Sequence, residues 1–166
     1  MEPLVDTVIE DERWGDLLPP LAERAARATL ADLCLAPEGF AIVVMGCDDA
    51  RIASLNADFR GKPVPTNVLS WPSDERGPAT PGEMPDPPEP GTAEMPEELG
   101  DIAIAWETCL REATGQGKRV EDHVTHLLVH ATLHLLGYDH IHDDDARMME
   151  DTEIRVLAKL GVSNPY

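Results

Sequence analysis

Apolar residues recur along this chain in two patterns, one typical of short β-strands and one typical of amphipathic helices. Short runs rich in β-branched residues predict strands, and apolar residues three or four positions apart predict helices. Together the patterns predict an α+β fold built on a small sheet. The expected strands are Val5–Ile9, Phe40–Met45, Val68–Trp71 and Leu99–Ala105; the expected helices are Asp16–Leu35, Asp48–Arg60, Trp106–Thr114, Val120–Leu136 and a last one from Asp143–Asp145 to about Gly161.

Some of these elements carry more specific expectations. Phe40–Met45 is apolar without interruption, which predicts a strand covered on both faces. Val120–Leu136 is apolar nearly all round, which predicts a central buried helix. Asp48 and the Asp143–Asp145 run are each expected to cap the helix that follows, because their carboxylates accept hydrogen bonds from free backbone amides. In the helix after Asp48 the residues expected to face inward are Ile52, Leu55 and Phe59.

The interval Pro72–Glu98 differs in composition from the rest of the chain. It holds eight prolines and eight acidic residues against one arginine. Such a segment cannot bury enough apolar surface to offset the entropy lost on ordering. We interpret it as a disordered, acidic, Pro-rich surface insertion between two strands of a single domain that spans residues 1–166.

The charge of the chain limits its partners. There are 32 Asp and Glu residues against 13 Lys and Arg, a formal net charge of −19. A generic nucleic-acid-binding surface is therefore not expected, and an anionic substrate would need a local positive centre such as a metal or a few placed arginines. For the same reason we expect no DNA partner. We also expect no membrane partner, since no apolar run approaches the ~18 residues of a membrane span.

The cysteines and the N-terminus bear on the compartment. Cys34, Cys47 and Cys109 are odd in number and scattered through apolar surroundings, so we expect buried free thiols and neither disulfides nor a metal knuckle. The first residues lack the basic and apolar regions of a signal peptide. These features predict a cytoplasmic location.

Six histidines fall within the twenty positions from His123 to His142. His130 and His134 are four residues apart in a helical run, so both imidazoles lie on one face. Gly137 suits the end of a helix, and the chain can then turn back and bring His140 to the same ion. Three neutral imidazoles with an open fourth position form the usual layout of a catalytic zinc site. The sequence therefore predicts one zinc ion held by these three histidines.

The other histidines fit the ion less well. His126 lies on the same helical stripe, but a helix rises ~6 Å in four residues, too far for three successive turns to share one ion. His126 is therefore expected to support a ligand or face the substrate. His142 is a less favoured ligand, and His123 a solvated or structural histidine. Asp139 either accepts a hydrogen bond from a ligand imidazole or caps the turn.

The spacing of the three histidines equals that of the metzincin proteases, with one difference. Those enzymes place a glutamate directly after the first histidine as general base, and here that residue is Ala131. This difference weakens the hypothesis of peptide hydrolysis, although a metalloprotease-like hydrolase stays an alternative. A second alternative is a non-catalytic protein whose zinc is structural, which a closed four-ligand site would support.

The stretches that carry a family resemblance are His130–His140, Leu55–Gly61, Pro65–Pro72 and Leu99–Ile104. They resemble the bacterial YbeY family of ribosomal-RNA maturation endoribonucleases. The resemblance follows the chain in order and leaves out the insertion. Ala131 stands where the family usually has glycine, while Asn67 and Trp71 replace its aspartate and phenylalanine, so Asn67 is assigned no catalytic role. The segment Asn164–Tyr166 is consistent with the resemblance.

The resemblance implies a mostly parallel or mixed four-stranded sheet flanked by helices, with a zincin-like site in which His130, His134 and His140 hold zinc. It also implies single-strand-specific RNA cleavage in 16S rRNA 3′-end maturation, ribosome biogenesis and ribosome quality control. The implied partners are ribosomal RNA and the ribosome or small-subunit assembly proteins. Either a water or the RNA 2′-hydroxyl fits as nucleophile. With the ribosome as partner, the non-catalytic alternative becomes a ribosome assembly factor with a structural zinc.

The family's functional arginine maps to Arg60. Its position before the Gly61-Lys62-Pro63 loop also makes chemical sense, because a guanidinium can clamp a phosphate and stabilise developing charge. The alternative is a surface arginine paired with one of the many carboxylates. Lys62 is a weaker candidate for contact with the RNA backbone, and Ser70 either faces the cleft or is structural.

Overall fold

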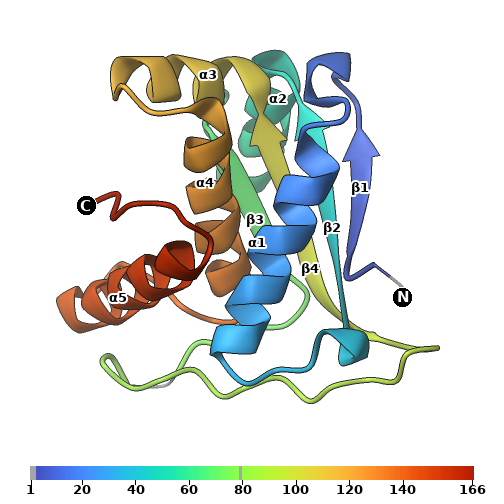
Figure 1. The fold of residues 1–166 in the computed structure, drawn as a ribbon, viewed down its shortest axis with the longest axis vertical. Helices are drawn as coiled ribbons and strands as arrows, with labels where there is room; N and C mark the ends of the chain where they lie inside the picture. Colours follow the sequence, from blue (N-terminus) through green and yellow to red (C-terminus); the bar gives the residue numbers. More distant parts are fainter. Residues whose placement is uncertain (1–2, 79) are drawn as a thin grey trace.

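The computed structural model describes residues 3–78 and 80–166, and its centre is one mixed sheet (Figure 1). The strand order is β1-β2-β4-β3. Strand β2 pairs in parallel with both β1 and β4, and β3 runs antiparallel to β4. The predicted α+β fold with a mostly parallel four-stranded sheet is confirmed. The strands are β1 (Val5–Ile9), β2 (Phe40–Cys47), β3 (Val68–Pro72) and β4 (Glu97–Ala105).

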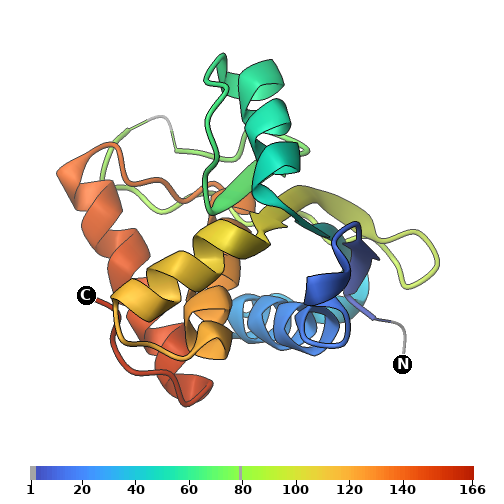
Figure 2. The ribbon, with the colours of Figure 1, turned by 90° about the horizontal axis from the view of Figure 1, so that it is seen from above.

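Helices cover the two faces of the sheet unequally. Helices α1 and α4 pack side by side on one face, with α5 outside α4, whereas α2 lies on the other face against β3 and β4 (Figures 1 and 2). No helix in the described part of the chain is long and apolar enough to cross a lipid bilayer. The helices are α1 (Leu18–Asp32), α2 (Asp49–Arg60), α3 (Trp106–Gly115), α4 (Val120–Leu135) and α5 (Asp143–Lys159), with short 3₁₀ turns at Glu12–Trp14 and Pro37–Gly39.

Helix α4 is the central buried helix that its composition predicts. It contacts α1, α3, α5 and the sheet, and Val124, Leu128 and Leu133 on it are at most 1% exposed. Burying side chains of this size stabilises the fold by about 1.5–3 kcal/mol each. The helix that carries the predicted metal ligands is therefore held on several sides by the main core.

The coverage of β2 and the orientation of Phe59 were predicted wrongly. Phe40, Ile42 and Val44 are buried, but the alternate residues of β2 are only half-buried, because α2 covers only part of that face. Phe59 is 51% exposed and packs edge-on against Trp71, with the ring centroids 5.4 Å apart. An apolar run thus marks this strand correctly but overstates its burial.

Local geometry settles three further expectations, two on helix caps and one on the cysteines. Asp48 caps α2 as predicted and accepts a 2.8 Å hydrogen bond from the Arg51 amide. The prediction that Asp143–Asp145 cap α5 is wrong, because His142 is the cap residue and the aspartates occupy the first turn, where the helix dipole favours acidic groups. Cys34 is exposed, not buried, since it follows α1 in a left-handed conformation (φ 62°) that turns the chain out of the buried stripe; Cys47 and Cys109 are buried free thiols.

The interval between β3 and β4 forms no helix or strand among its described residues, 73–78 and 80–96. It touches the body at defined points. The Gly82 amide donates to Asp145 Oδ1 at 2.7 Å, and the Gly91 amide donates to the Gly39 carbonyl at 2.9 Å. The predicted bounds of the insertion, Pro72–Glu98, are too wide, because Pro72 ends β3 and Glu97 and Glu98 begin β4, where they pair with neighbouring strands. That the residues between the two strands are disordered stays a prediction.

Candidate metal centre

The turn after α4 brings the third histidine back toward the first two. The Gly137 amide donates to the His134 carbonyl, and the Tyr138 amide donates to the Leu133 carbonyl, both at 3.0 Å. This pair of bonds is the Schellman arrangement, which requires a left-handed residue after the helix. Gly137 has φ of 98° and supplies it. The chain then reverses, and His140 lies beside the helix end.

The two helix histidines are oriented by acceptors behind their rings. His134 Nδ1 lies 2.9 Å from the Tyr138 carbonyl oxygen, and His130 Nδ1 lies 3.3 Å from Glu153 Oε1. Since a carbonyl or carboxylate oxygen only accepts, each Nδ1 carries the proton and each Nε2 keeps its lone pair. The two Nε2 atoms face each other 3.0 Å apart.

His130, His134 and His140 form a group that could hold a metal ion. One ligand nitrogen from each lies within 4.8 Å of the others. Two nitrogens at tetrahedral positions on zinc lie roughly 3.4 Å apart, given bonds near 2.1 Å, so small shifts would complete the site. In residues 3–78 and 80–166 no fourth His, Cys, Asp or Glu joins the group. The closed four-ligand geometry of a structural zinc is therefore not seen among the described residues.

Burial tunes the ionisable groups at this centre. Burial, with a smaller effect of His130 and His140, lowers the pKa of His134 to about 4, so its ring is neutral near pH 7, as a metal ligand must be. Burial opposes ionisation of Glu153, but hydrogen bonds from His126 and His130 outweigh it and lower the pKa of Glu153 to about 2. A fixed negative charge therefore lies behind His130.

A cleft of about 250 Å³ opens over the three histidines. Helix α4 forms one wall and strand β3, together with the residues before it, forms another. No Asp or Glu side chain lines this cleft among the described residues, and Ala131 takes the place of the protease general base. The lining residues are Arg60, Thr66, Asn67, Val68, Ser70, His126, Leu127, His130, Ala131, His134, His140 and Tyr166.

Arg60 ends α2 and reaches the same cleft. The structure gives its guanidinium no carboxylate partner among the described residues, although the chain is acidic. Arg60 and Ser70 also line an adjoining hollow of about 500 Å³ together with His134 and His140. Lys62 lines neither space. The side chain predicted to meet a phosphate thus faces the histidines across an open space.

The remaining histidines separate by their partners. His126 lines the cleft, and its Nε2 lies 2.8 Å from Glu153 Oε1. His123 is buried, with Nε2 2.9 Å from Glu112 Oε1, which agrees with a structural role. Asn67 Nδ2 donates to the same Glu112 oxygen at 3.0 Å, so the asparagine also has a structural contact.

The residues of the turn after His140 lie elsewhere. His142 is exposed and lines a different hollow. It does not belong to the group of three histidines that could hold a metal. Asp139 accepts a 2.7 Å hydrogen bond from the His140 amide, as expected of a turn residue, and its Oδ1 lies 3.8 Å from Nδ1 of the His140 ring, too far for a hydrogen bond.

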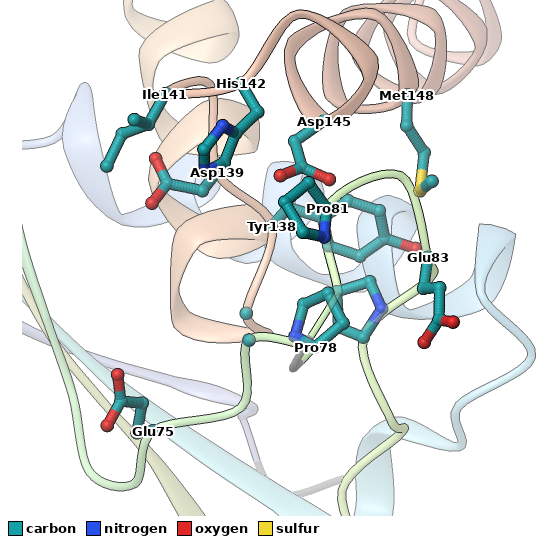
Figure 3. A pocket seen from close by; sticks show the side chains of 13 residues that line it. Glu75, Pro78, Pro81, Glu83, Tyr138, Asp139, Ile141, His142, Asp145 and Met148 are labelled. Carbon is teal, nitrogen blue, oxygen red and sulfur yellow. The ribbon is translucent and has the colours of Figure 1, made fainter.

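The hollow that His142 lines has a volume of about 250 Å³. It lies between the insertion and the turn after α4 (Figure 3). Pro78, Pro81 and Glu83 of the insertion stand opposite Tyr138 and Asp145. The insertion therefore lies against the segment that carries His140. The full lining is Glu75, Gly77, Pro78, Pro81, Glu83, Pro85, Gly137, Tyr138, Asp139, Ile141, His142, Asp145 and Met148.

Glu153 is the residue of this site that the sequence patterns did not reveal. It lies 23 residues from His130, on another helix, and many carboxylates of the chain look alike in sequence. One signal was present. Glu153 interrupts the apolar stripe of α5 four residues after Met149 and three before Val156, both fully buried. An acid within an apolar stripe must find a buried partner.

Fold and site together define a class: an α+β protein with a three-histidine site that could hold a metal, in a cleft also lined by an arginine that has no carboxylate partner among the described residues. Residues 11–161 match the family model described as Endoribonuclease YbeY. The chain belongs to the YbeY family.

Relatives named Endoribonuclease YbeY support this over the whole chain. The protein of Cereibacter sphaeroides is 67% identical, with 100% of both chains covered. That of Paracoccus denitrificans is 61% identical over 98% of this chain and 89% of its own. The solution structure of TM1509 from Thermotoga maritima, 20% identical, matches with a TM-score of 0.61 over 94% of this chain and 88% of that one, which shows a shared fold.

Proposed function

We propose that this chain is a zinc-dependent endoribonuclease that cleaves single-stranded RNA and acts in 16S rRNA 3′-end maturation, ribosome biogenesis and ribosome quality control. The observation that carries the proposal is the shared cleft. Three histidines able to hold a metal and an unpaired arginine line one space, and the chain belongs to a family named for endoribonuclease activity. Ribosomal RNA as substrate also keeps the cytoplasm as the expected compartment.

His130, His134 and His140 would hold the ion. The donor set fits zinc, because all three are imidazole nitrogens and two have their Nε2 lone pairs fixed toward each other. When bound, the ion would supply Lewis acidity at the scissile phosphate. The histidines would fix its position at the floor of the cleft that Arg60 also lines.

Arg60 would bind the phosphate. Its guanidinium offers a planar fork of donors that matches two phosphate oxygens, and no ion pair with a described residue must be broken to release it. Ser70 and His126 line the same cleft and are placed to contact the ribose or the phosphate. These groups would orient the RNA so that the scissile bond lies over the histidines.

Two nucleophiles are compatible with this site, a water and the RNA 2′-hydroxyl. Product ends distinguish them. Attack by the 2′-hydroxyl leaves a 2′,3′-cyclic phosphate, whereas attack by water does not. Mass spectrometry of the cleaved fragment is the direct measurement.

The charge of the chain bears on its partners. With a net charge of −19, the body repels RNA at long range, so we expect weak and salt-sensitive affinity for free RNA. Ribosomal or small-subunit assembly proteins would then bring the enzyme to its substrate. Tight binding of free RNA that is insensitive to salt would contradict this part of the proposal.

The function is tested by cleavage of a single-stranded ribosomal RNA fragment. Zinc-loaded wild type should cleave it, whereas His134→Ala and wild type treated with a chelator should not. A duplex of the same sequence should resist cleavage. Cleavage that persists in folded His134→Ala would overturn the proposal, and casein cleavage lost in His130→Ala would favour a protease instead.

A further inference from the structure

Glu153 is buried more completely than its charge alone would allow. The residue is 0% exposed, on the face of α5 that packs toward α4. Removing a lone carboxylate from water costs on the order of several kcal/mol, and hydrogen bonds must offset that cost. Its neighbours on the stripe, Met149 and Val156, are apolar. A leucine would fill such a position more cheaply, so the acid needs another reason to be there.

Three polar side chains converge on this carboxylate. His126 Nε2 lies 2.8 Å and His130 Nδ1 3.3 Å from Oε1, while the Tyr166 hydroxyl donates to Oε1 at 3.1 Å and to Oε2 at 3.0 Å. The partners come from α4 and from the C-terminal segment. All of them also line the cleft or border it, so the carboxylate lies directly behind the site.

We propose that Glu153 is the positioning residue of the metal centre: by accepting the Nδ1 proton of His130 it fixes the tautomer and rotation of that ring, so that Nε2 faces His134. Histidines that ligate metals usually donate their second ring proton to a carboxylate or a carbonyl, which orients the ring and strengthens it as a ligand. The inference rests on the metal centre of the proposed function and not on the RNA substrate.

Two other histidines of α4, His134 and His123, can be compared with His130. His134 is oriented by a neutral acceptor, the Tyr138 carbonyl, whereas His130 is oriented by a charge. We therefore expect His130 to be the stronger donor to the ion. Glu112 makes a similar 2.9 Å contact to His123 at the other end of α4, but that ring is no member of the metal group. Glu112 is thus a matched carboxylate–histidine pair without the metal.

The test is zinc affinity, measured on the full chain by competition with a chelator. Glu153→Gln keeps the shape and one acceptor oxygen but removes the charge, and it should weaken zinc binding roughly 10–100-fold. The visible absorption of the cobalt-substituted protein should change with it. Glu112→Gln should leave zinc affinity unchanged. Wild-type affinity in folded Glu153→Gln, or equal weakening in Glu112→Gln, would overturn the positioning role.

A measurement on the unmodified protein covers the case in which Glu153→Gln does not fold. Nitrogen-15 NMR of the zinc-loaded wild type should show His130 with a protonated Nδ1. A bare Nδ1 would overturn the inference. His130→Ala separates the two proposals: zinc affinity equal to wild type in that variant refutes the metal centre itself, whereas a loss there without a loss in Glu153→Gln refutes only the role of Glu153.

Discussion

Arg76 of the insertion donates a 2.9 Å hydrogen bond from Nη1 to the backbone carbonyl of Leu135, the last residue of α4. The same nitrogen donates to the Leu99 carbonyl of β4 at 3.2 Å. A cation at a helix C-terminus satisfies free carbonyls and interacts favourably with the helix dipole. One side chain of the Pro-rich interval thus joins the helix that carries the histidines to the sheet.

Replacing Arg76 with alanine should therefore lower the free energy of unfolding by about 1–3 kcal/mol, because buried carbonyls lose a charged donor. Urea denaturation measures this directly. Arg24→Ala is the control, since Arg24 is exposed on α1 and far from the insertion in sequence. Equal stability of the Arg76 and Arg24 variants would show that the anchor contributes nothing.

Gly137→Ala should be more damaging than its position in a turn suggests. The residue has φ of 98°, and a Cβ there would lie 2.5 Å from the Arg76 carbonyl oxygen. The left-handed conformation alone costs about 1–2 kcal/mol for a residue with a Cβ, and the clash adds to that. Because the turn carries His140, zinc affinity should fall as well. Thermal unfolding and chelator competition measure the two effects.

Gly161→Ala separates conformation from clash. Gly161 also follows a helix with positive φ, 77°, but a Cβ there would meet nothing within 4 Å. It should cost only the conformational part and leave zinc affinity unchanged. If the two alanine variants lose the same stability, the contact between Gly137 and Arg76 is not a constraint on the turn.

Gly137 and its neighbour Arg76 also show how far the sequence alone predicts the site. The grouping of the three histidines could be predicted because helical spacing fixes His130 and His134 on one face, and Gly137 marks the turn that returns His140. That they hold zinc stays a prediction. Arg76 could not be assigned, since the composition of its segment predicts disorder and its contacts cross 59 residues of chain. Sequence patterns report what is close along the chain, whereas Arg76 and Glu153 act between elements.

The errors in the fold have a similar origin. Phe59 lies on the predicted inward stripe of α2, but that helix covers only part of its face of the sheet. Helical periodicity gives the direction of a side chain and not the area of the surface that it meets. The bounds of the strands and helices, by contrast, depend on local signals such as Asp48 and were predicted to within a few residues.

The pairing of α1 with α5 should make stability depend on acid pH. Arg155 and Lys159 both donate hydrogen bonds to Asp32. The bond from Arg155, with a smaller effect of Lys159, outweighs burial and holds the pKa of the Asp32 carboxyl below its usual range. A carboxyl with a lower pKa in the native state adds stability above its unfolded pKa of about 3.9, and this is lost as pH falls through the native pKa. The Asp32→Asn variant should thus be less stable than wild type near pH 7.

The measurement is urea denaturation from neutral pH down into the acid range. The difference between wild type and Asp32→Asn should be constant at neutral pH and shrink below about pH 4. Asp6→Asn, at an exposed position of β1, should show no such difference. A difference that grows on acidification would reverse the sign and contradict the assignment.

Zinc should raise the melting temperature of the wild-type chain, since a ligand that binds only the native state stabilises it. The gain is about 2.7 kcal/mol when free zinc is a hundredfold above its dissociation constant. His134→Ala and His140→Ala should lose this shift, and a chelator should reverse it in wild type. His142→Ala should keep the shift, because His142 is no member of the histidine group. A shift lost only in His142→Ala would reassign the third ligand.

Arg60 should matter for RNA cleavage and for little else. Its guanidinium faces the cleft without a carboxylate partner among the described residues, so Arg60→Ala should leave the melting temperature and zinc affinity as in wild type. Loss of a donor that stabilises transition-state charge costs about 10²–10³-fold in rate. Steady-state cleavage of a single-stranded ribosomal RNA fragment measures the loss. Arg60→Lys should recover part of the rate, since it keeps the charge without the planar fork. Arg24→Ala should cleave like wild type, and an Arg60→Ala variant as active as that control would remove Arg60 from the reaction.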